Sequence, residues 1–470
     1  MSEPLSDVLI ALRQAAAPAI PVHLVTEADL DAVLSSAAPM ARAVAAAAAF
    51  TGKASQALIL PGADGETQAV LFGLGKGGDV MALRGLPSKL APGDYSLGDS
   101  PFPIQQAALA FALGSYRFDR YKKEPGKPRP RLVVEDAAAR AEAERIAHAT
   151  ALARDMVNTP ANDMGPLQIE TIAREIAAAF GAQITVVTGD ALLEANYPVI
   201  HAVGRAAAAH RAPRMIEIRW AGSGAAFDAP LIALVGKGVV FDTGGLDIKP
   251  SAGMRWMKKD MGGAAHALAL ARLVMGADLP VGLAVLIPVV ENAIAGDAMR
   301  PGDVLNSRAG LTIEVGNTDA EGRLILADAL TRAAELEPAL TIDLATLTGA
   351  ARVALGPEVI PFYTADEALA AETASAAANL SDPLWRMPLW AGYEPSLDSE
   401  IADLKNDPDP WAQAGSVTAA LFLQRFAPKS GAWMHLDIFA WSSRGRPGWP
   451  AGAEAQAIRA LYAVLKARYH

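Results

Sequence analysis

The chain has 470 residues, of which 52% are hydrophobic and 20% charged, a composition typical of folded rather than disordered proteins. Its 41 Lys and Arg residues against 51 Asp and Glu residues give a net charge of -10, which disfavours nucleic acid as the main partner. The absence of cysteine excludes disulfides, thiolate nucleophiles and cysteine-ligated metal sites, so a metal would need oxygen and nitrogen ligands.

The first residues do not match a secretory signal. Glu3 and Asp7 stand where such a signal needs basic residues, and no suitable cleavage pattern follows. The most apolar runs, such as residues 43–50, are too short to span a bilayer. We therefore expect no membrane association and a cytoplasmic location.

The first 134 residues predict a small α/β domain, because short apolar runs at residues 57–60 and 69–74 alternate with alanine-rich helical stretches. Four glycines between positions 73 and 78 surround Lys76 and raise the alternative of a phosphate-binding loop. This interpretation is disfavoured, because the full spacing of such a loop and its Ser or Thr are missing.

A basic, proline-rich stretch at residues 116–131 marks a boundary by its composition. DNA binding by this stretch, as a secondary role, is the alternative, but the acidic total favours a solvated connector. Residues 135–157 are typical of a long Ala/Arg/Glu helix, stopped at Asn158-Thr-Pro160. We expect an N-terminal domain over residues 1–134, a linker helix over 135–157 and a larger domain over 158–470.

Beyond Pro166, strands alternate with helices. The sequence predicts strands at residues 214–220, 231–235, 281–290, 311–315 and 340–344, and helices at residues 263–275 and 324–336. This alternation predicts an α/β/α arrangement, in which a central, mostly parallel mixed sheet is covered by helices on both faces. In such folds, functional sites gather at the ends of strands.

Polar residues gather in three short segments at predicted strand ends or helix starts. The first, residues 235–249, places Lys237, Asp242 and Lys249 in mostly apolar and glycine sequence. Lysines are costly there unless they are paired. Two glycines that follow Asp242 permit a tight turn around a small ion.

In the second segment, Asp260 lies just before a helix that starts with two glycines, where an ordinary N-cap is the favoured interpretation for this residue alone. The third segment reads Asn317-Thr-Asp319-Ala-Glu321-Gly-Arg323. In extended backbone the side chains of Asp319 and Glu321 point the same way, whereas on a helix they would diverge by about 200°. Two acids aimed at one spot require a cation between them, and a solvated turn is the alternative.

The four carboxylates of these segments carry enough negative charge to balance two divalent cations. Lys237 would add a nitrogen ligand if burial and the ions lower the pKa of its amine, while Lys249 and Arg323 stay cationic. Such a set suits zinc, manganese or cobalt, and two ions sharing a water predict metal-assisted hydrolysis. The candidate ligands are Lys237, Asp242, Asp260, Asp319 and Glu321.

Competing catalytic motifs are weak. The seven histidines are scattered, no His-Glu-x-x-His is present, and no Gly-x-Ser-x-Gly is present. His266 and His435 are therefore expected to be structural residues rather than ligands.

These motifs resemble those of the leucyl aminopeptidase (cytosol aminopeptidase) family of dinuclear metallo-exopeptidases. The resemblance runs from Asn158-Thr-Pro-Ala-Asn162 to the C-terminus, and residues 317–323 are similar to the family's signature heptapeptide. It implies a smaller N-terminal α/β domain, a larger catalytic α/β/α domain and hydrolysis of peptides at their N-terminus. Further support comes from residues 235–249, 260–265, 300–304 and 345–350.

The resemblance implies a role for each ligand. Asp242 and Glu321 would bridge two ions. Asp319 would belong mainly to one ion, and Lys237 and Asp260 to the other. Asp260 and its ion would also receive the free α-amino group of the substrate, which explains cleavage at the N-terminus alone.

The resemblance also implies that Lys249 polarises the peptide carbonyl and that Arg323 positions a bicarbonate acting as general base. Family members assemble as hexamers, so a homohexamer is implied. The sequence departs from the family pattern at residues 406–411, with residues 407–410 at the centre, and at residues 448–454. Both segments lie near regions that shape substrate access or the far wall of the pocket in the family. The substrate-binding residues implied are Met257 and Thr346 in the first side-chain pocket, with Asn317, Leu347 and Gly349.

Overall fold

The computed structural model describes residues 11–14, 18–62, 64–124 and 126–469, and it divides into two compact units. Among the described residues, the larger unit holds 152–441 and 453–469, and the smaller one holds those up to 151 together with 442–452. The division falls within helix α4 (Ala137–Asn158), and the domain limits expected from the sequence stay a prediction. No helix in the described ranges is long and apolar enough to cross a membrane.

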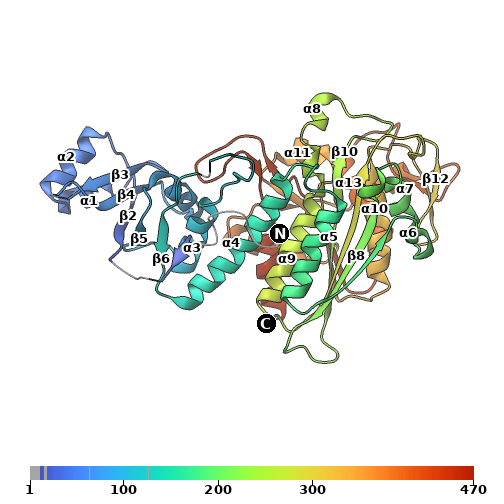
Figure 1. Cartoon of the computed structure of the whole chain (residues 1–470), viewed down its shortest axis with the longest axis horizontal. Helices are drawn as coiled ribbons and strands as arrows, with labels where there is room; N and C mark the ends of the chain where they lie inside the picture. The colour runs from blue at the N-terminus through green and yellow to red at the C-terminus, as the bar shows by residue number, and fades with distance from the viewer. Residues whose placement is uncertain (1–10, 15–17, 63, 125, 470) are drawn as a thin grey trace. The chain divides into compact units, whose positions relative to one another are not determined.

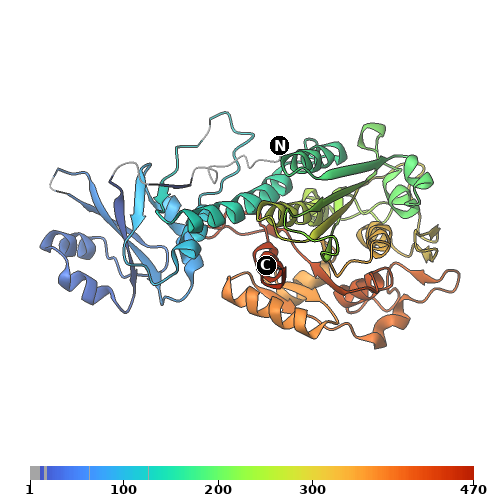
Figure 2. The ribbon, with the colours of Figure 1, turned by 90° about the horizontal axis from the view of Figure 1, so that it is seen from below.

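The smaller unit is built on a six-stranded sheet of order β1-β6-β5-β2-β4-β3, in which all neighbours are parallel except β3 and β4. Helices α1 and α2, blue in Figure 2, pack side chains such as Leu30 and Ala45 against Val25, Leu58 and Leu71 of the sheet. The elements are β1 (Leu12–Arg13), β2 (Ile20–Thr26), α1 (Leu30–Ser36), α2 (Pro39–Ala47), β3 (Ala57–Pro61), β4 (Thr67–Gly75), the 3-10 helix η2 (Val80–Lys89), β5 (Asp94–Leu97), α3 (Ile104–Gly114) and β6 (Arg131–Val133).

The glycine cluster around Lys76 ends strand β4 and turns the chain toward η2. The N-cap of η2 is Asp79, whose carboxylate accepts a hydrogen bond of 2.9 Å from the backbone N–H of Met81. A phosphate bound at a helix N-terminus would meet this carboxylate. The structure therefore argues against a phosphate-binding loop here.

The larger unit is built on a nine-stranded sheet of order β16-β15-β18-β14-β9-β11-β8-β7, with β10 also paired to β11. Strands β18, β14, β9 and β11 are parallel, whereas β7 and β8 are antiparallel neighbours at one end. This confirms the mostly parallel mixed sheet. The strands are β7 (Gln183–Thr188), β8 (Arg214–Ala221), β9 (Leu231–Gly236), β10 (Gly238–Asp242), β11 (Gly282–Asn292), β14 (Leu340–Ala345), β15 (Ile360–Tyr363), β16 (Leu384–Arg386) and β18 (Ala432–Asp437).

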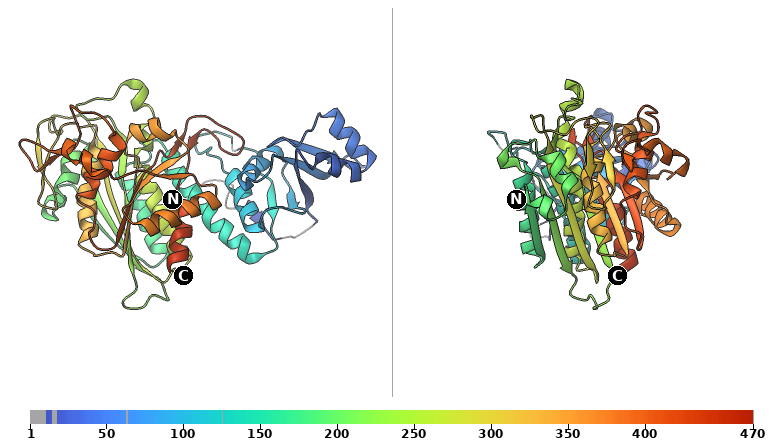
Figure 3. Two further views of the ribbon diagram at one scale, coloured as in Figure 1. Left: turned by 180° about the vertical axis from the view of Figure 1, so that it is seen from behind. Right: turned by 90° about the vertical axis from the view of Figure 1, so that its right-hand side faces the viewer.

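Helices cover this sheet, with α5 and α9 in front of the strands in Figure 1 and further helices around the sheet in Figure 3. The helices are α5 (Pro166–Ala179), α6 (Ala191–Glu194), α7 (Pro198–Gly204), α8 (Ser251–Met254), α9 (Gly262–Gly276), α10 (Glu321–Ala334), α11 (Gly349–Leu355), α12 (Glu367–Asn379), α13 (Gly415–Gln424) and α14 (Ile458–Tyr469), with the 3-10 helices η3 (Ala209–Arg211), η4 (Met257–Met261) and η5 (Ala391–Leu397). Smaller ladders join β12 (Val304–Asn306), β13 (Thr312–Glu314) and β17 (Leu404–Lys405), and β19 (Trp441–Ser442) with β20 (Gly452–Ala453).

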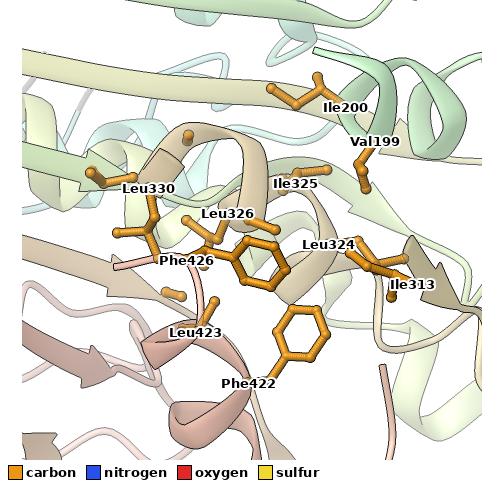
Figure 4. Packing of buried hydrophobic residues seen from close by; sticks show 14 of the residues in the cluster. Val199, Ile200, Ile313, Leu324, Ile325, Leu326, Leu330, Phe422, Leu423 and Phe426 are labelled. Atoms are coloured by element: carbon orange, nitrogen blue, oxygen red, sulfur yellow. The ribbon is translucent and has the colours of Figure 1, made fainter. Parts of the chain in front are cut away.

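One large hydrophobic cluster fixes helix α10 on the sheet. Phe422 and Phe426 lie beside α10 with their ring centroids 5.3 Å apart (Figure 4). Leu326 of α10 and Val235 of β9 belong to the same cluster and are fully buried. Each such side chain stabilises the fold by about 1.5–3 kcal/mol, so the first turn of α10 is held rigidly at the edge of the sheet.

The parallel strands bring chemically active segments to one edge. Strands β9 and β14 run in the same direction, with Leu344 opposite Gly236, so Lys237 and Thr346 emerge from the same edge. Strand β10 ends at Asp242, which pairs with Asn292 at the end of β11. Figure 1 shows β10, α8 and α11 gathered at this end of the larger unit.

Helix α9 begins in close contact with these strand ends, and Gly263 allows it. A Cβ at Gly263 would overlap the carbonyl oxygen of Leu344 and lie 2.6 Å from the backbone nitrogen of Lys237. We predict that Gly263→Ala lowers the free energy of unfolding by about 1–3 kcal/mol, because the backbone must shift to accommodate the methyl group. Urea-induced unfolding followed by tryptophan fluorescence measures this change.

Gly253→Ala is the matched control, because the nearest atom to its added Cβ, from Pro250, is 3.9 Å away. That variant should be at least as stable as the original chain, because alanine fits the space and favours the helical backbone of α8. Equal stability of the Gly263→Ala variant would show that the close approach of α9 is not a constraint.

Candidate metal centre

A cavity of about 620 Å³ lies at the strand ends of the larger unit. It collects most of the site residues expected from the sequence, although they are spread over more than one hundred positions of the chain. Glu321 does not line the cavity but is buried at its edge, 1% exposed. The lining includes Lys237, Asp242, Lys249, Met257, Asp260, Asn317, Asp319, Arg323, Thr346, Leu347 and Gly349.

Asp242 is held from three sides. Its Oδ1 accepts hydrogen bonds from the backbone N–H of Gly244 at 2.9 Å and from Asn292 Nδ2 at 2.8 Å. Its Oδ2 lies 2.8 Å from Lys249 Nζ. Gly244 has φ +90°, a left-handed conformation that glycine adopts without strain. The turn after β10 therefore orients both Asp242 and Lys249.

Lys237 forms the centre of a second group. Its Nζ lies 2.8 Å from Asp260 Oδ2 and 3.0 Å from Glu321 Oε1, and it donates to the carbonyl of Thr346 at 2.9 Å. The approach requires Gly322, since a Cβ there would lie 2.6 Å from Lys237 Nζ. The amine of Lys237 is therefore in direct contact with the carboxylate of Glu321.

The expected extended backbone between Asp319 and Glu321 is wrong. Asp319 lies in a turn, where its backbone N–H donates to Asn317 Oδ1 at 2.8 Å, and Glu321 is the first residue of α10. The two carboxylates still converge, because the turn and the helix start bring them together. Oxygens of Asp242, Asp319 and Glu321 all lie within 4.8 Å of one another.

The N-cap interpretation of Asp260 is also wrong. Helix α9 begins after Met261, whose side chain caps nothing. Asp260 instead ends in the cavity, where Thr346 Oγ1 donates to its Oδ1 at 2.8 Å and Lys237 lowers its pKa against the opposing effect of burial. The carboxylate is therefore aimed at the site rather than at the helix.

The carboxylates resist full ionisation without a further cation. Burial and Asp242 raise the pKa of Asp319 to about 6, although Lys249 opposes them, and they raise the pKa of Glu321 well above its usual range. Asp260 Oδ2 and Glu321 Oε1 lie close to Lys237, yet neither is in a well-directed hydrogen bond with any described residue. Buried, closely spaced oxygens of this kind fit divalent metal ions.

Lys237 is cationic in this arrangement. Burial lowers the pKa of its amine, but Asp260, Glu321 and Asp242 outweigh burial and hold the pKa above its usual range. An amine can bind a metal only after losing its proton. Lys237 would therefore release a proton on joining the ligand set.

Arg323, two residues after Glu321 on α10, presents a buried guanidinium to the cavity. It is 7% exposed, and burial lowers its pKa to about 10 against the opposing charges of Asp407 and Asp437. Its Nε and Nη1 donate to no group within the described part of the chain. A buried guanidinium of this kind fits a small planar anion.

The expected substrate-binding residues surround the same cavity. The backbone N–H groups of Leu347 and Thr348 both donate to Asp437 Oδ1 at 3.0 Å, which fixes the backbone between β14 and α11. Asn317 lines the cavity while bracing the turn of Asp319. Asp437 and Asn292, which position these segments, carry no local sequence signal and were not anticipated.

The two histidines singled out in the sequence are structural, as expected. His266 Nδ1 contacts the carbonyl of Gly262 at 2.7 Å, and its Nε2 accepts from the backbone N–H of Gln456 at 3.0 Å. Burial lowers the pKa of His266 to about 4, so the ring is neutral. His435 Nδ1 lies 2.5 Å from Asp343 and is fully buried.

Comparison with known proteins gives a consistent result over both units. A family model described as the cytosol aminopeptidase family, catalytic domain, matches residues 151–462, and one for the M17 aminopeptidase N-terminal domain matches residues 20–135. A probable cytosol aminopeptidase of Syntrophotalea carbinolica is 39% identical over 452 residues, covering 89% of this chain and 90% of the relative.

Two solved structures extend the comparison. The cytosol aminopeptidase of Coxiella burnetii superposes with a TM-score of 0.91 at 41% identity, covering 98% of this chain and 99% of that one. The bottromycin maturation enzyme BotP in complex with Mn superposes with a TM-score of 0.86 at 32% identity, covering 96% and 100%.

The geometry predicts that Asp319→Asn weakens metal binding, because it removes one negative charge from the convergent carboxylates. The original chain should bind manganese or zinc and gain thermal stability from it. In the variant we expect less bound metal by elemental analysis and a smaller rise in melting temperature on metal addition.

Asp228→Asn, at an exposed position, is the control and should leave both measurements unchanged. Metal content and thermal shift equal to those of the original chain in Asp319→Asn would remove Asp319 from the ligand set.

Proposed function

This chain belongs to the cytosol aminopeptidase family, and we propose that its cavity removes N-terminal amino acids from peptides with the help of two divalent ions. Members of this family are metal-dependent exopeptidases, and this general activity is shared with the relatives.

The observation that carries the proposal is the presence of two overlapping ligand groups in one cavity. Asp242, Asp319 and Glu321 converge within 4.8 Å, and Lys237 joins Glu321 to Asp260 at 3.0 and 2.8 Å. Glu321 is common to both groups. Two ions would therefore be held side by side, with Asp242 and Glu321 shared, Asp319 on one ion, and Lys237 and Asp260 on the other.

Bound divalent ions supply Lewis acidity and a water of lowered pKa. The chain supplies the positioning. Asp260, anchored by Thr346, would receive the α-amino group of the substrate, and the first side chain would then lie along Met257 and Thr346. This arrangement limits cleavage to the first peptide bond, because only a free N-terminus presents that amine.

Lys249 is suited to stabilise negative charge that develops on the peptide carbonyl oxygen. Burial lowers the pKa of its amine, but Asp242 and Glu321 outweigh burial and keep the pKa above its usual range, so the group remains a cation. Its Nζ also contacts Asp319, which fixes it at the rim of the ligand groups. A preorganised cation in a water-poor cleft is an effective form of catalysis.

Arg323 is suited to hold bicarbonate, which would act as general base and pass the proton to the leaving amine. The support is the buried guanidinium whose Nε and Nη1 donate to none of the residues described in the structure. A planar anion with three oxygens matches the fork of donors. Because Arg323 lines the same cavity as Asp242 and Asp319, the anion would lie in the cavity that holds the ligand groups.

We further propose zinc or manganese, or else cobalt, as the native ion, on the basis of the oxygen and amine ligands. The BotP structure contains manganese. A homohexamer in the cytoplasm, working on peptides, follows from the family resemblance and the relatives' name. Light scattering of the purified chain measures its assembly.

Metal dependence is the first test of the proposed function. Chelator treatment should abolish hydrolysis of an amino-acid anilide, and added manganese or zinc should restore it, because the carboxylates alone cannot activate water. Rates before and after chelation, with elemental analysis of each sample, measure this effect. Activity that persists in metal-free protein would refute the two-ion proposal.

The role of Lys249 gives a second test. Lys249→Met should lower kcat/KM by about 10²–10³-fold, mainly through kcat, because a charge that acts in the transition state is removed. Bound metal should stay near its original level. Lys53→Met, at an exposed position of the smaller unit, is the control and should leave both unchanged.

If the loss of activity in Lys249→Met followed a matching loss of metal, Lys249 would be a structural partner of Asp242 and not a catalytic group. Measuring both quantities on one sample separates these outcomes.

A further inference from the structure

Lys259 is a nearly buried cation that the proposed mechanism does not use. It belongs to η4, directly before Asp260, and is 7% exposed while lining the cavity. Its Nζ lies 4.8 Å from the centroid of the Phe439 ring. With the residues that the structure describes, its amine forms neither a hydrogen bond nor an ion pair. Burying an ammonium without a paired carboxylate is unfavourable.

A second cation faces the same ring. Arg352 on α11 lines the cavity, and its Cζ lies 5.7 Å from the centroid of Phe439. No carboxylate of the described ranges is within ion-pair distance of it. Attraction to an aromatic face is weak compared with a charged hydrogen bond, so one ring does not neutralise two cations. Asp260 and Asp437 act on Lys259 only from beyond ion-pair distance, so among the described residues neither cation is paired with a carboxylate. The two cations are therefore available to bind the carboxylate of a ligand.

We propose that Lys259 and Arg352 bind a carboxylate of the substrate, so that peptides with an N-terminal Glu or Asp are favoured. This inference rests on the proposed function and specifies its substrate class. Lys259 adjoins Asp260, which would receive the α-amino group, and Met257 lines the cavity one turn earlier. The first side chain is therefore the part of a bound peptide nearest to Lys259. The other source of a carboxylate is the C-terminus of a dipeptide.

The test compares anilides of Glu, Gln and Leu, which carry no C-terminal carboxylate. In the original chain, kcat/KM for the Glu substrate should exceed that for the Gln substrate by about tenfold or more, because a site built around a charge discriminates against its neutral analogue. In Lys259→Met the ratio should fall to about one, mostly through KM. The ratio within one variant cancels a general loss of activity.

Lys258→Met is the matched control. Lys258 is the preceding residue, but its Nζ donates to the carbonyl of Asn158 and it does not line the cavity, so this variant should keep the Glu to Gln ratio. Arg352→Gln, at an exposed position, should lower the ratio in part, and it supplies an independent readout if Lys259→Met does not fold.

Three results would overturn the inference. The first is a Glu to Gln ratio of one or less in the original chain. The second is a ratio that Lys259→Met and Arg352→Gln leave unchanged. The third is a dependence on Lys259 that appears only when Leu-Gly is compared with Leu-Gly-amide, which would assign the cations to a C-terminal carboxylate. Hydrolysis of the Leu anilide with added metal tests the proposed function separately, so failure of the inference leaves that function standing.

Discussion

The interaction on which this site depends is the repulsion among buried carboxylates at the ends of the central strands. Asp242, Asp319 and Glu321 share one small volume, and burial together with Asp242 raises the pKa of both Asp319 and Glu321. Such a group persists only where cations face it. Lys237 forms ion pairs with Asp260 and Glu321, and Lys249 forms ion pairs with Asp242 and Asp319. Divalent metal ions would offset the repulsion among the carboxylates more strongly, because each ion carries two positive charges.

Close backbone approach makes this concentration of charge feasible. Gly322 leaves room for the amine of Lys237 beside α10, and Gly263 lets α9 begin against the carbonyl of Leu344. Larger residues at these positions would separate Lys237 from Glu321 or lift α9 from the sheet. The glycines therefore contribute to the chemistry through geometry alone, and the hydrophobic packing of Phe422 and Leu326 keeps the helix start from moving.

The strand and helix alternation beyond Pro166 predicted the sheet and the edge at which the site lies, because period and composition are local properties. The convergence of Asp319 and Glu321 was predicted from an extended backbone, but it arises because Asp319 lies in a turn and Glu321 begins a helix. Asn292 and Asp437 could not be predicted from the sequence pattern. Each contacts a segment far away in the chain, since Asn292 binds Asp242 and Asp437 binds Leu347. Contacts between distant segments do not produce a periodic pattern in the sequence.

With two divalent ions bound, the cavity would be less negative than the whole chain, whose net charge is -10. Two divalent ions would neutralise the four carboxylates, and Lys249 would then lose the charge compensation that Asp242 and Asp319 provide. An acidic side chain entering such a cavity would be drawn toward the ions and would compete with the α-amino group for them. Lys259 and Arg352, set around Phe439, offer that side chain another position, so binding of the amine at Asp260 and binding of the acid become compatible.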